Sequence, residues 1–150
     1  MSVVVAACTV VAGIVAGIVW LRYRFVVVTV AGHSMAPTFE PGDRVLARRA
    51  RLGRVRAGDI VVVGPAGRTP AALPPPGHGH PWIIKRAVAV PGDRVPRERV
   101  PALAAVAEAT VPPGKLVLLG DGPHSSDSRQ VGYFDGARLV GRAVYRLPRR

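Results

Sequence analysis

The chain of 150 residues is long enough for one domain of ordinary size and a small appendage. Its single cysteine, Cys8, excludes an internal disulfide framework and any cysteine-rich metal site. Lys and Arg number 21 against 9 acidic residues, a formal net charge of +12. Such an excess suits an anionic partner, which can be phospholipid head groups or nucleic acid.

The N-terminal segment predicts a membrane anchor. Residues 3–21 carry no charge, and as a helix they would extend about 28 Å, close to the hydrocarbon thickness of a bilayer. Trp20 and Tyr23 follow where an aromatic belt belongs, and Arg22 and Arg24 lie at the level of the head groups. A cleaved signal peptide is the alternative, but no Lys or Arg precedes the apolar run. We therefore expect a transmembrane anchor over residues 1–21, with membrane lipids as partners.

The remaining residues, 22–150, are expected to form one domain rich in β structure. Apolar and β-branched runs predict strands at 25–31, 45–47, 60–63, 82–90, 116–119 and 138–147, and only residues 102–109 suggest a short helix. Gly-Asp steps separate several of these runs, at Gly42-Asp43, Gly58-Asp59, Gly92-Asp93 and Gly120-Asp121. Turn chemistry explains these aspartates, which argues against a pair of catalytic carboxylates.

Two further segments of the chain are expected to be solvent-exposed surface and not a metal-binding or nucleic-acid-binding site. The Pro- and Gly-rich stretch 64–81 reads as a long loop containing His78 and His80, a pair with no third metal ligand nearby, so we expect no metal. The arginines of residues 48–56 have no interleaved aromatic residues on which bases could stack. We expect a solvated or lipid-facing basic edge there, and no nucleic-acid partner.

Ser34 is a candidate nucleophile. It follows an apolar run and precedes Met35-Ala36-Pro37, which predicts a constrained turn that exposes the hydroxyl and the neighbouring backbone N–H groups. A serine can attack a peptide bond without a histidine if a neutral lysine amine takes its proton.

Lys85 is the candidate base. Strand alternation puts it on one face with Ile83, Ala87 and Ala89, and burial on that apolar face would lower the lysine pKa from about 10.4. Arg86 faces the other way and cannot act as a base, because its guanidinium stays charged. The alternative is an edge-strand lysine whose amine reaches water.

A Ser/His/Asp triad is the competing hypothesis. His33 adjoins Ser34, but neighbouring side chains of an extended chain point to opposite faces. His78 and His80 fall in the predicted loop, and His124 precedes a Ser-rich turn. None has the ordered, buried setting that a base needs.

Several motifs occur together in chain order: Ser34-Met35-x-Pro37-Thr38, Gly42-Asp43, Gly58-Asp59-Ile60, Ile84-Lys85-Arg86 before Pro91-Gly92-Asp93, and Gly120-Asp121 before Ser125-x-Asp127-Ser128-Arg129. This series resembles the type I signal peptidase family of Ser/Lys endopeptidases. The resemblance implies a mainly β fold with an antiparallel sheet, a single N-terminal transmembrane helix and no cofactor. It also implies a catalytic domain outside the cytoplasmic membrane that cleaves the signal peptides of exported preproteins after small-x-small sequences, typically Ala-x-Ala.

Matched residue by residue, Ser34 resembles the nucleophile, with its backbone N–H in the oxyanion site, and Lys85 resembles the general base. Ser125 resembles the serine that orients the lysine, with Ser126 as an alternative. The structural residues near the site are, by the same resemblance, Gly32, Met35, Asp127 and Arg129, the last two as an ion pair. Gly32 stands where some members have a serine that supports the oxyanion, and Gly122 replaces the usual Asn after Gly120-Asp121.

Three questions stay open at this point. The charges flanking the apolar segment lie on its C-terminal side, so the positive-inside tendency favours a cytoplasmic domain, whereas the resemblance favours an extracytoplasmic one. We expect the latter, because folded domains cross membranes despite their charge. A maturation protease with one or few clients, or a non-catalytic cationic membrane adaptor, are the alternative functions. The oligomeric state is not predicted.

Overall fold

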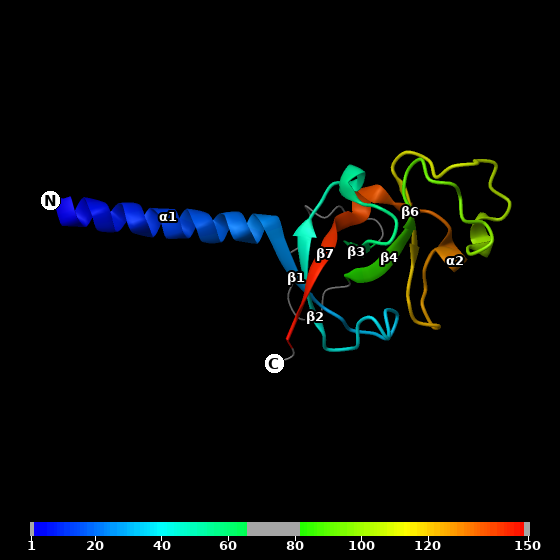
Figure 1. Cartoon of the computed structure of the whole chain (residues 1–150), viewed down its shortest axis with the longest axis horizontal. Coiled ribbons are helices and arrows are strands. Elements are labelled where there is room, and N and C mark those ends of the chain that lie inside the picture. The colour runs from blue at the N-terminus through cyan, green and yellow to red at the C-terminus, as the bar shows by residue number, and fades with distance from the viewer. Residues whose placement is uncertain (1, 66–81, 149–150) are drawn as a thin grey trace.

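In the computed structural model, which describes residues 2–65 and 82–148, a long helix extends from a β-rich domain (Figure 1). This helix, α1 (Ser2–Arg24), contains an 18-residue window, Ala7–Arg24, with a mean hydropathy of 1.4 and none of the window buried. An apolar helix of that length with no protein around it is a candidate transmembrane segment. The helix continues past Leu21, and Arg22 and Arg24 lie in its last turn.

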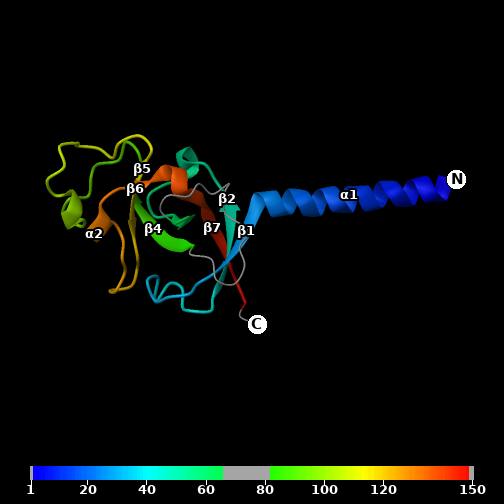
Figure 2. The ribbon, with the colours of Figure 1, turned by 180° about the vertical axis from the view of Figure 1, so that it is seen from behind.

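Seven strands form one sheet in the order β1-β2-β7-β3-β4-β5-β6, and every neighbouring pair is antiparallel. The strands are β1 (Phe25–Thr29), β2 (Arg44–Arg49), β3 (Ile60–Val63), β4 (Ile83–Ala89), β5 (Lys115–Leu119), β6 (Phe134–Asp135) and β7 (Leu139–Leu147). The sheet curls, so the two views show β1 and β2 near α1 and β5 and β6 on the other side (Figures 1 and 2). The mainly β, antiparallel fold predicted from the sequence is confirmed.

The buried side chains explain which parts of the chain the sheet holds together. One cluster joins β1 and β2 to Met35 and Phe39 of the turn after β1. A second cluster lies between β3, β5 and β7, and a third packs the segment 95–111 against β5. Because Met35 is 1% exposed and Phe39 is 7% exposed, the turn that carries Ser34 is anchored in the first of these clusters.

Some local predictions were wrong. Residues 102–109 form no α-helix: a short 3-10 helix spans Pro101–Leu103, and turns and bends follow it. Two elements were missed, the two-residue strand β6 and the short helix α2 (Ser128–Val131), and β1 ends at Thr29 rather than at Ala31. Both missed elements are too short to give a periodic sequence signal. Most of the predicted loop 64–81, with His78 and His80, lies outside the described residues.

Three of the four Gly-Asp steps are the turns that the sequence predicted. The carboxylates of Asp43, Asp59 and Asp93 accept hydrogen bonds from backbone N–H groups three residues earlier, at 2.8, 2.9 and 2.9 Å. The glycines before them have positive φ values of 88°, 94° and 90°, a conformation that favours glycine. The fourth aspartate, Asp121, has a different role, described below.

Candidate active site

Ser34 lies in a tight turn that follows β1. The N–H of Ala36 donates to the His33 carbonyl at 3.0 Å, and the N–H of Phe39 donates to the Met35 carbonyl at 2.9 Å. Met35 and Phe39 point into the core, while Ser34 remains partly exposed. The local hydrogen bonds and the buried flanking side chains therefore hold the serine at the surface in a defined backbone conformation.

A second loop contacts the backbone of this turn. The N–H of Gly122 donates to the Ser34 carbonyl at 3.0 Å, and a Cβ atom on Gly122 would collide with the carbonyl of His33. A Cβ atom on Gly120 would collide with the Ser34 carbonyl and with the Ser125 side chain. Only glycine fits this close approach, which explains why Gly122 stands in place of a larger residue.

Lys85 is buried on β4, opposite Val61 of β3, and is 3% exposed. Its Nζ lies 2.6 Å from Oγ of Ser125, which is itself buried, whereas Ser126 is exposed. The structure therefore brings Ser125, and not Ser126, into hydrogen-bonding contact with the lysine amine. The alternative of an edge-strand lysine whose amine reaches water is wrong, because the Lys85 side chain is buried.

The surroundings of Lys85 lower its pKa. Burial is the largest cause, because it disfavours the ammonium form; the nearby Asp127 carboxylate raises the pKa and the Arg129 guanidinium lowers it. The balance favours the neutral amine relative to a lysine in water. A neutral amine has a lone pair with which it can accept a proton.

Asp127 connects the parts of the site beneath Lys85. Its side chain is fully buried and bonded to Arg129 through Nε at 3.0 Å and Nη2 at 2.7 Å. It also accepts a hydrogen bond from the Gly120 N–H at 2.8 Å and caps the N-terminus of α2. Burial by itself would raise the pKa of Asp127, but hydrogen bonds from Arg129, Gly120 and Ser125 lower it well below its usual range. The carboxylate is therefore ionised.

Ser34 and Lys85 line the same hollow, which has a volume of about 610 Å³. Its walls come from the end of β1 and the turn after it, the start of β4, and the region around α2 and β6, and they include Gly32, Trp82, Ser126 and Val131. Among the described residues, the Lys85 amine forms a hydrogen bond with Ser125 but none with the Ser34 hydroxyl. Catalytic hydrogen bonds are often long before substrate binds, so the missing bond does not by itself argue against proton transfer between the two residues.

The sequence did not predict the role of Arg86, Asp121 and Thr38. Arg86 binds the Asp121 carboxylate through Nε at 2.9 Å and Nη2 at 2.7 Å, and the Thr38 hydroxyl donates to Asp121 at 2.6 Å. The three side chains thus join β4, the loop after β5 and the turn of Ser34. All three residues belong to motifs seen in the sequence: Ile84-Lys85-Arg86, Pro37-Thr38 and Gly120-Asp121. The spacing of these motifs did not show that their side chains contact one another.

The histidines of the competing triad are arranged differently. His33 and His124 are both exposed, and within residues 2–65 and 82–148 no hydrogen bond links either side chain to Ser34 or to a carboxylate. His78 and His80 lie outside that part of the chain. The described residues also contain no group of three His, Cys, Asp or Glu side chains that could hold a metal ion.

Comparison with known proteins identifies the family of the chain. The family model described as signal peptidase, peptidase S26, matches residues 2–102 and 98–147, which together cover nearly the whole chain. A comparison with curated proteins found no match. On its sequence match, which includes the strands and loops that carry Ser34, Lys85 and Ser125, the chain belongs to the signal peptidase family, peptidase S26.

Proposed function

We propose that the protein is a membrane-anchored Ser/Lys endopeptidase that removes signal peptides from exported preproteins, with Ser34 as nucleophile and Lys85 as general base. Membership of the peptidase S26 family supports signal peptidase activity in general. The observation that carries the finer proposal is the environment of Lys85: a buried amine, 2.6 Å from Ser125 Oγ, in the hollow that Ser34 also lines.

The chemistry is acyl transfer in two stages. In the first, neutral Lys85 takes the Ser34 proton as Oγ attacks the scissile carbonyl carbon, and the oxyanion forms against the Ser34 N–H. The C–N bond then breaks, and the Lys85 ammonium gives its proton to the departing amine. In the second stage, Lys85 takes a proton from water as the water oxygen attacks the Ser34 ester carbon. The bond from that carbon to Ser34 Oγ then breaks, Lys85 gives the proton to Oγ, and the signal peptide leaves with a free carboxylate.

Ser125 orients the amine in this scheme. Its hydroxyl donates to the Asp127 carboxylate, so its oxygen remains available to accept an N–H from Lys85. One N–H of the amine is thereby fixed, which restricts the directions in which the lone pair can point. Asp127 and Arg129 act through Ser125 and the loop 120–127, and are positioning residues.

The hollow suits an extended peptide with small side chains. Its walls include residues 29–32 at the end of β1 and residues 82–84 at the start of β4, and an extended peptide beside a strand edge can form main-chain hydrogen bonds. Ala31 and Gly32 add little bulk beside Ser34. These features support cleavage after Ala-x-Ala-like sequences, and the candidate membrane helix α1 supports a single-pass protein that meets anchored substrates at the bilayer. We place the catalytic domain on the extracytoplasmic side, where exported preproteins emerge.

The experiment is cleavage of a preprotein with an Ala-x-Ala site by the full chain reconstituted in lipid vesicles. Ser34→Ala and Lys85→Met are expected to abolish cleavage, while Lys115→Met, the other lysine of the chain, keeps it. Retention of cleavage in Lys85→Met would overturn the Ser/Lys assignment without affecting family membership. A panel of different preproteins then separates a general peptidase from a maturation protease with few clients.

A further inference from the structure

A second hollow, distinct from the one that holds Ser34, is lined almost entirely by arginine. It has a volume of about 760 Å³, and its lining residues are Arg24, Arg48, Arg49, Ala50, Arg51, Gly53, Arg54, Arg56 and Arg142. They come from the last residue of α1, the end of β2, the segment that follows it and β7. We call this surface the arginine hollow.

The positive charge of the arginine hollow is largely uncompensated. Of its arginines, Arg142 lies 3.3 Å from the Asp59 carboxylate. In the part of the chain that the structure describes, none of the other six is within salt-bridge distance of an acidic side chain. Like charges so close together repel one another, so the arrangement is stabilised most by an anion with several oxygen acceptors.

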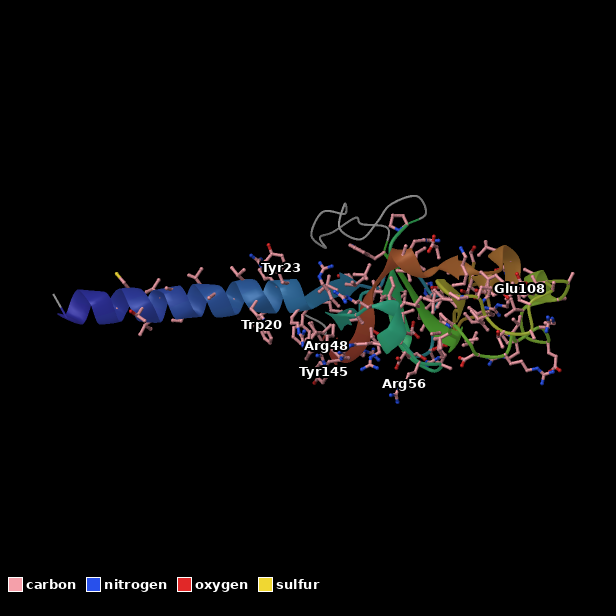
Figure 3. All side chains as sticks on the ribbon, turned by 90° about the horizontal axis from the view of Figure 1, so that it is seen from above. Trp20, Tyr23, Arg48, Arg56, Glu108 and Tyr145 are labelled. Atoms are coloured by element: carbon pink, nitrogen blue, oxygen red, sulfur yellow. The ribbon has the colours of Figure 1, made fainter. Side chains whose placement is uncertain are left out.

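The arginine hollow lies next to the candidate transmembrane helix. Arg24 is both a wall of the hollow and the last residue of the candidate transmembrane window, and its guanidinium stacks on the Trp20 ring at 5.6 Å. Figure 3 shows Trp20 and Tyr23 at the end of α1 and Arg48 where the helix meets the domain. Tyr145, 62% exposed, lies on β7 opposite Leu46 of β2, and Figure 3 shows it on the same side of the domain as Arg48. Exposed aromatic and arginine side chains at one level are typical of the head-group region of a bilayer.

We propose that the arginine hollow binds the phosphodiester head groups of anionic phospholipids in the membrane that α1 spans, and so holds the domain against that membrane. Guanidinium groups match phosphate oxygens in bidentate geometry. The lining residues include no aromatic side chain on which a base could stack, which disfavours single-stranded nucleic acid as the ligand. The proposal needs α1 in a membrane and is independent of the peptidase activity.

The test uses the full chain reconstituted in vesicles of phosphatidylcholine with a minor fraction of phosphatidylglycerol. After release into mild detergent, native mass spectrometry counts the phosphatidylglycerol and phosphatidylcholine molecules that stay bound. Wild-type protein is expected to retain phosphatidylglycerol preferentially. Arg51→Gln/Arg54→Gln is expected to reduce that preference roughly tenfold, since each arginine near an anionic surface contributes about fivefold to binding and screening removes part of it.

A matched variant with the same loss of charge is Arg94→Gln/Arg99→Gln. Both arginines are exposed and lie between β4 and β5, the same segment as Glu108, which Figure 3 shows at the end of the domain away from α1. This variant is expected to keep the wild-type preference. Equal preference in wild type and both variants, or an equal loss in both, would overturn the proposal. So would an unchanged lipid preference in Arg51→Gln/Arg54→Gln accompanied by lost affinity for a single-stranded oligonucleotide, which would assign the surface to nucleic acid.

Discussion

Lys85 Nζ lies 2.6 Å from Ser125 Oγ, although the two residues are 40 positions apart in the chain. Both side chains are buried, and Ser125 is in turn hydrogen-bonded to the ionised Asp127. A lysine in this position is held away from water by the sheet and kept in one orientation by the loop after β5.

Removing the Ser125 hydroxyl should impair catalysis more than substrate binding. We expect Ser125→Ala to lower kcat by about 10- to 100-fold with little change in KM, because a buried hydrogen-bonding partner of the amine is lost. Steady-state cleavage of an Ala-x-Ala peptide by the full chain measures both constants. Ser126→Ala should have a smaller effect on kcat, since Ser126 is exposed; a larger effect of Ser126→Ala would contradict the assignment of Ser125.

Arg129 should set part of the pH dependence. Its guanidinium lowers the Lys85 pKa, and it also neutralises Asp127, whose charge raises that pKa. In Arg129→Gln both effects are lost, and each loss raises the Lys85 pKa. The acidic limb of the kcat/KM profile should therefore move to higher pH. Arg129→Lys, which keeps the charge, should leave the limb nearer its wild-type position. A limb that moves to lower pH in Arg129→Gln would rule out Lys85 as the titrating base.

Lys85 is expected to reduce the stability of the folded protein. Burial lowers its pKa in the folded protein from the ordinary value of 10.5, so the unfolded chain binds more protons between the folded and the unfolded pKa, and stability rises with pH across that window. Lys85→Met removes this penalty and should raise Tm at pH 7 by on the order of a few °C while abolishing activity.

Thermal unfolding of the full chain in detergent, followed by circular dichroism, measures that difference. The gain should shrink as the pH approaches 10.5, where the unfolded lysine also loses its proton. Lys115→Met serves as the comparison and should show no such pH-dependent gain. A Tm of Lys85→Met that is below the wild-type value at pH 7 would mean that the amine stabilises the fold.

Gly32 offers a gain-of-function test. A Cβ atom there meets no other atom within 4 Å, and the residue lines the hollow two positions before Ser34. A serine fits this space and can place a hydroxyl near the developing oxyanion, so Gly32→Ser should raise kcat by roughly tenfold, somewhat less than the loss seen when such a donor is removed. Gly32→Ala adds the Cβ atom without the hydroxyl and should give no gain. Equal rates for the two variants would exclude a hydroxyl contribution from this position.

The sequence predicted those features that rest on local pattern. β-branched runs located six of the strands, the Gly-Asp steps gave three turns with aspartate caps, and alternation placed Lys85 on an apolar face. The resemblance of 125–129 to a family motif then selected Ser125 and Asp127. These signals depend on a few neighbouring residues, so they can be recognised in the sequence without knowledge of the fold.

What the sequence could not provide depends on contacts across the sheet. Asp121 looked like another turn aspartate, but the curl of the sheet brings it to Arg86 and Thr38, 35 and 83 positions away. Gly122 looked like a departure from the family pattern, and its reason is the carbonyl of His33 packed against it. The expected helix at 102–109 failed although its Ala, Leu and Glu residues favour a helix, because eight residues are too few to hold a helix by themselves and Leu103 and Val106 pack into the third core cluster instead.

In the proposed mechanism, Lys85 activates the Ser34 hydroxyl. The most direct measurement is labelling of the full chain by a serine-directed acylating probe, with the modified residue located by mass spectrometry and the labelling rate followed against pH. Acylation of Ser34 is expected at a rate that rises as Lys85 loses its proton, with labelling at least about 100-fold slower in Lys85→Met than in Lys115→Met. Labelling of Ser34 at the same rate in Lys85→Met, or labelling confined to another serine, would contradict this mechanism.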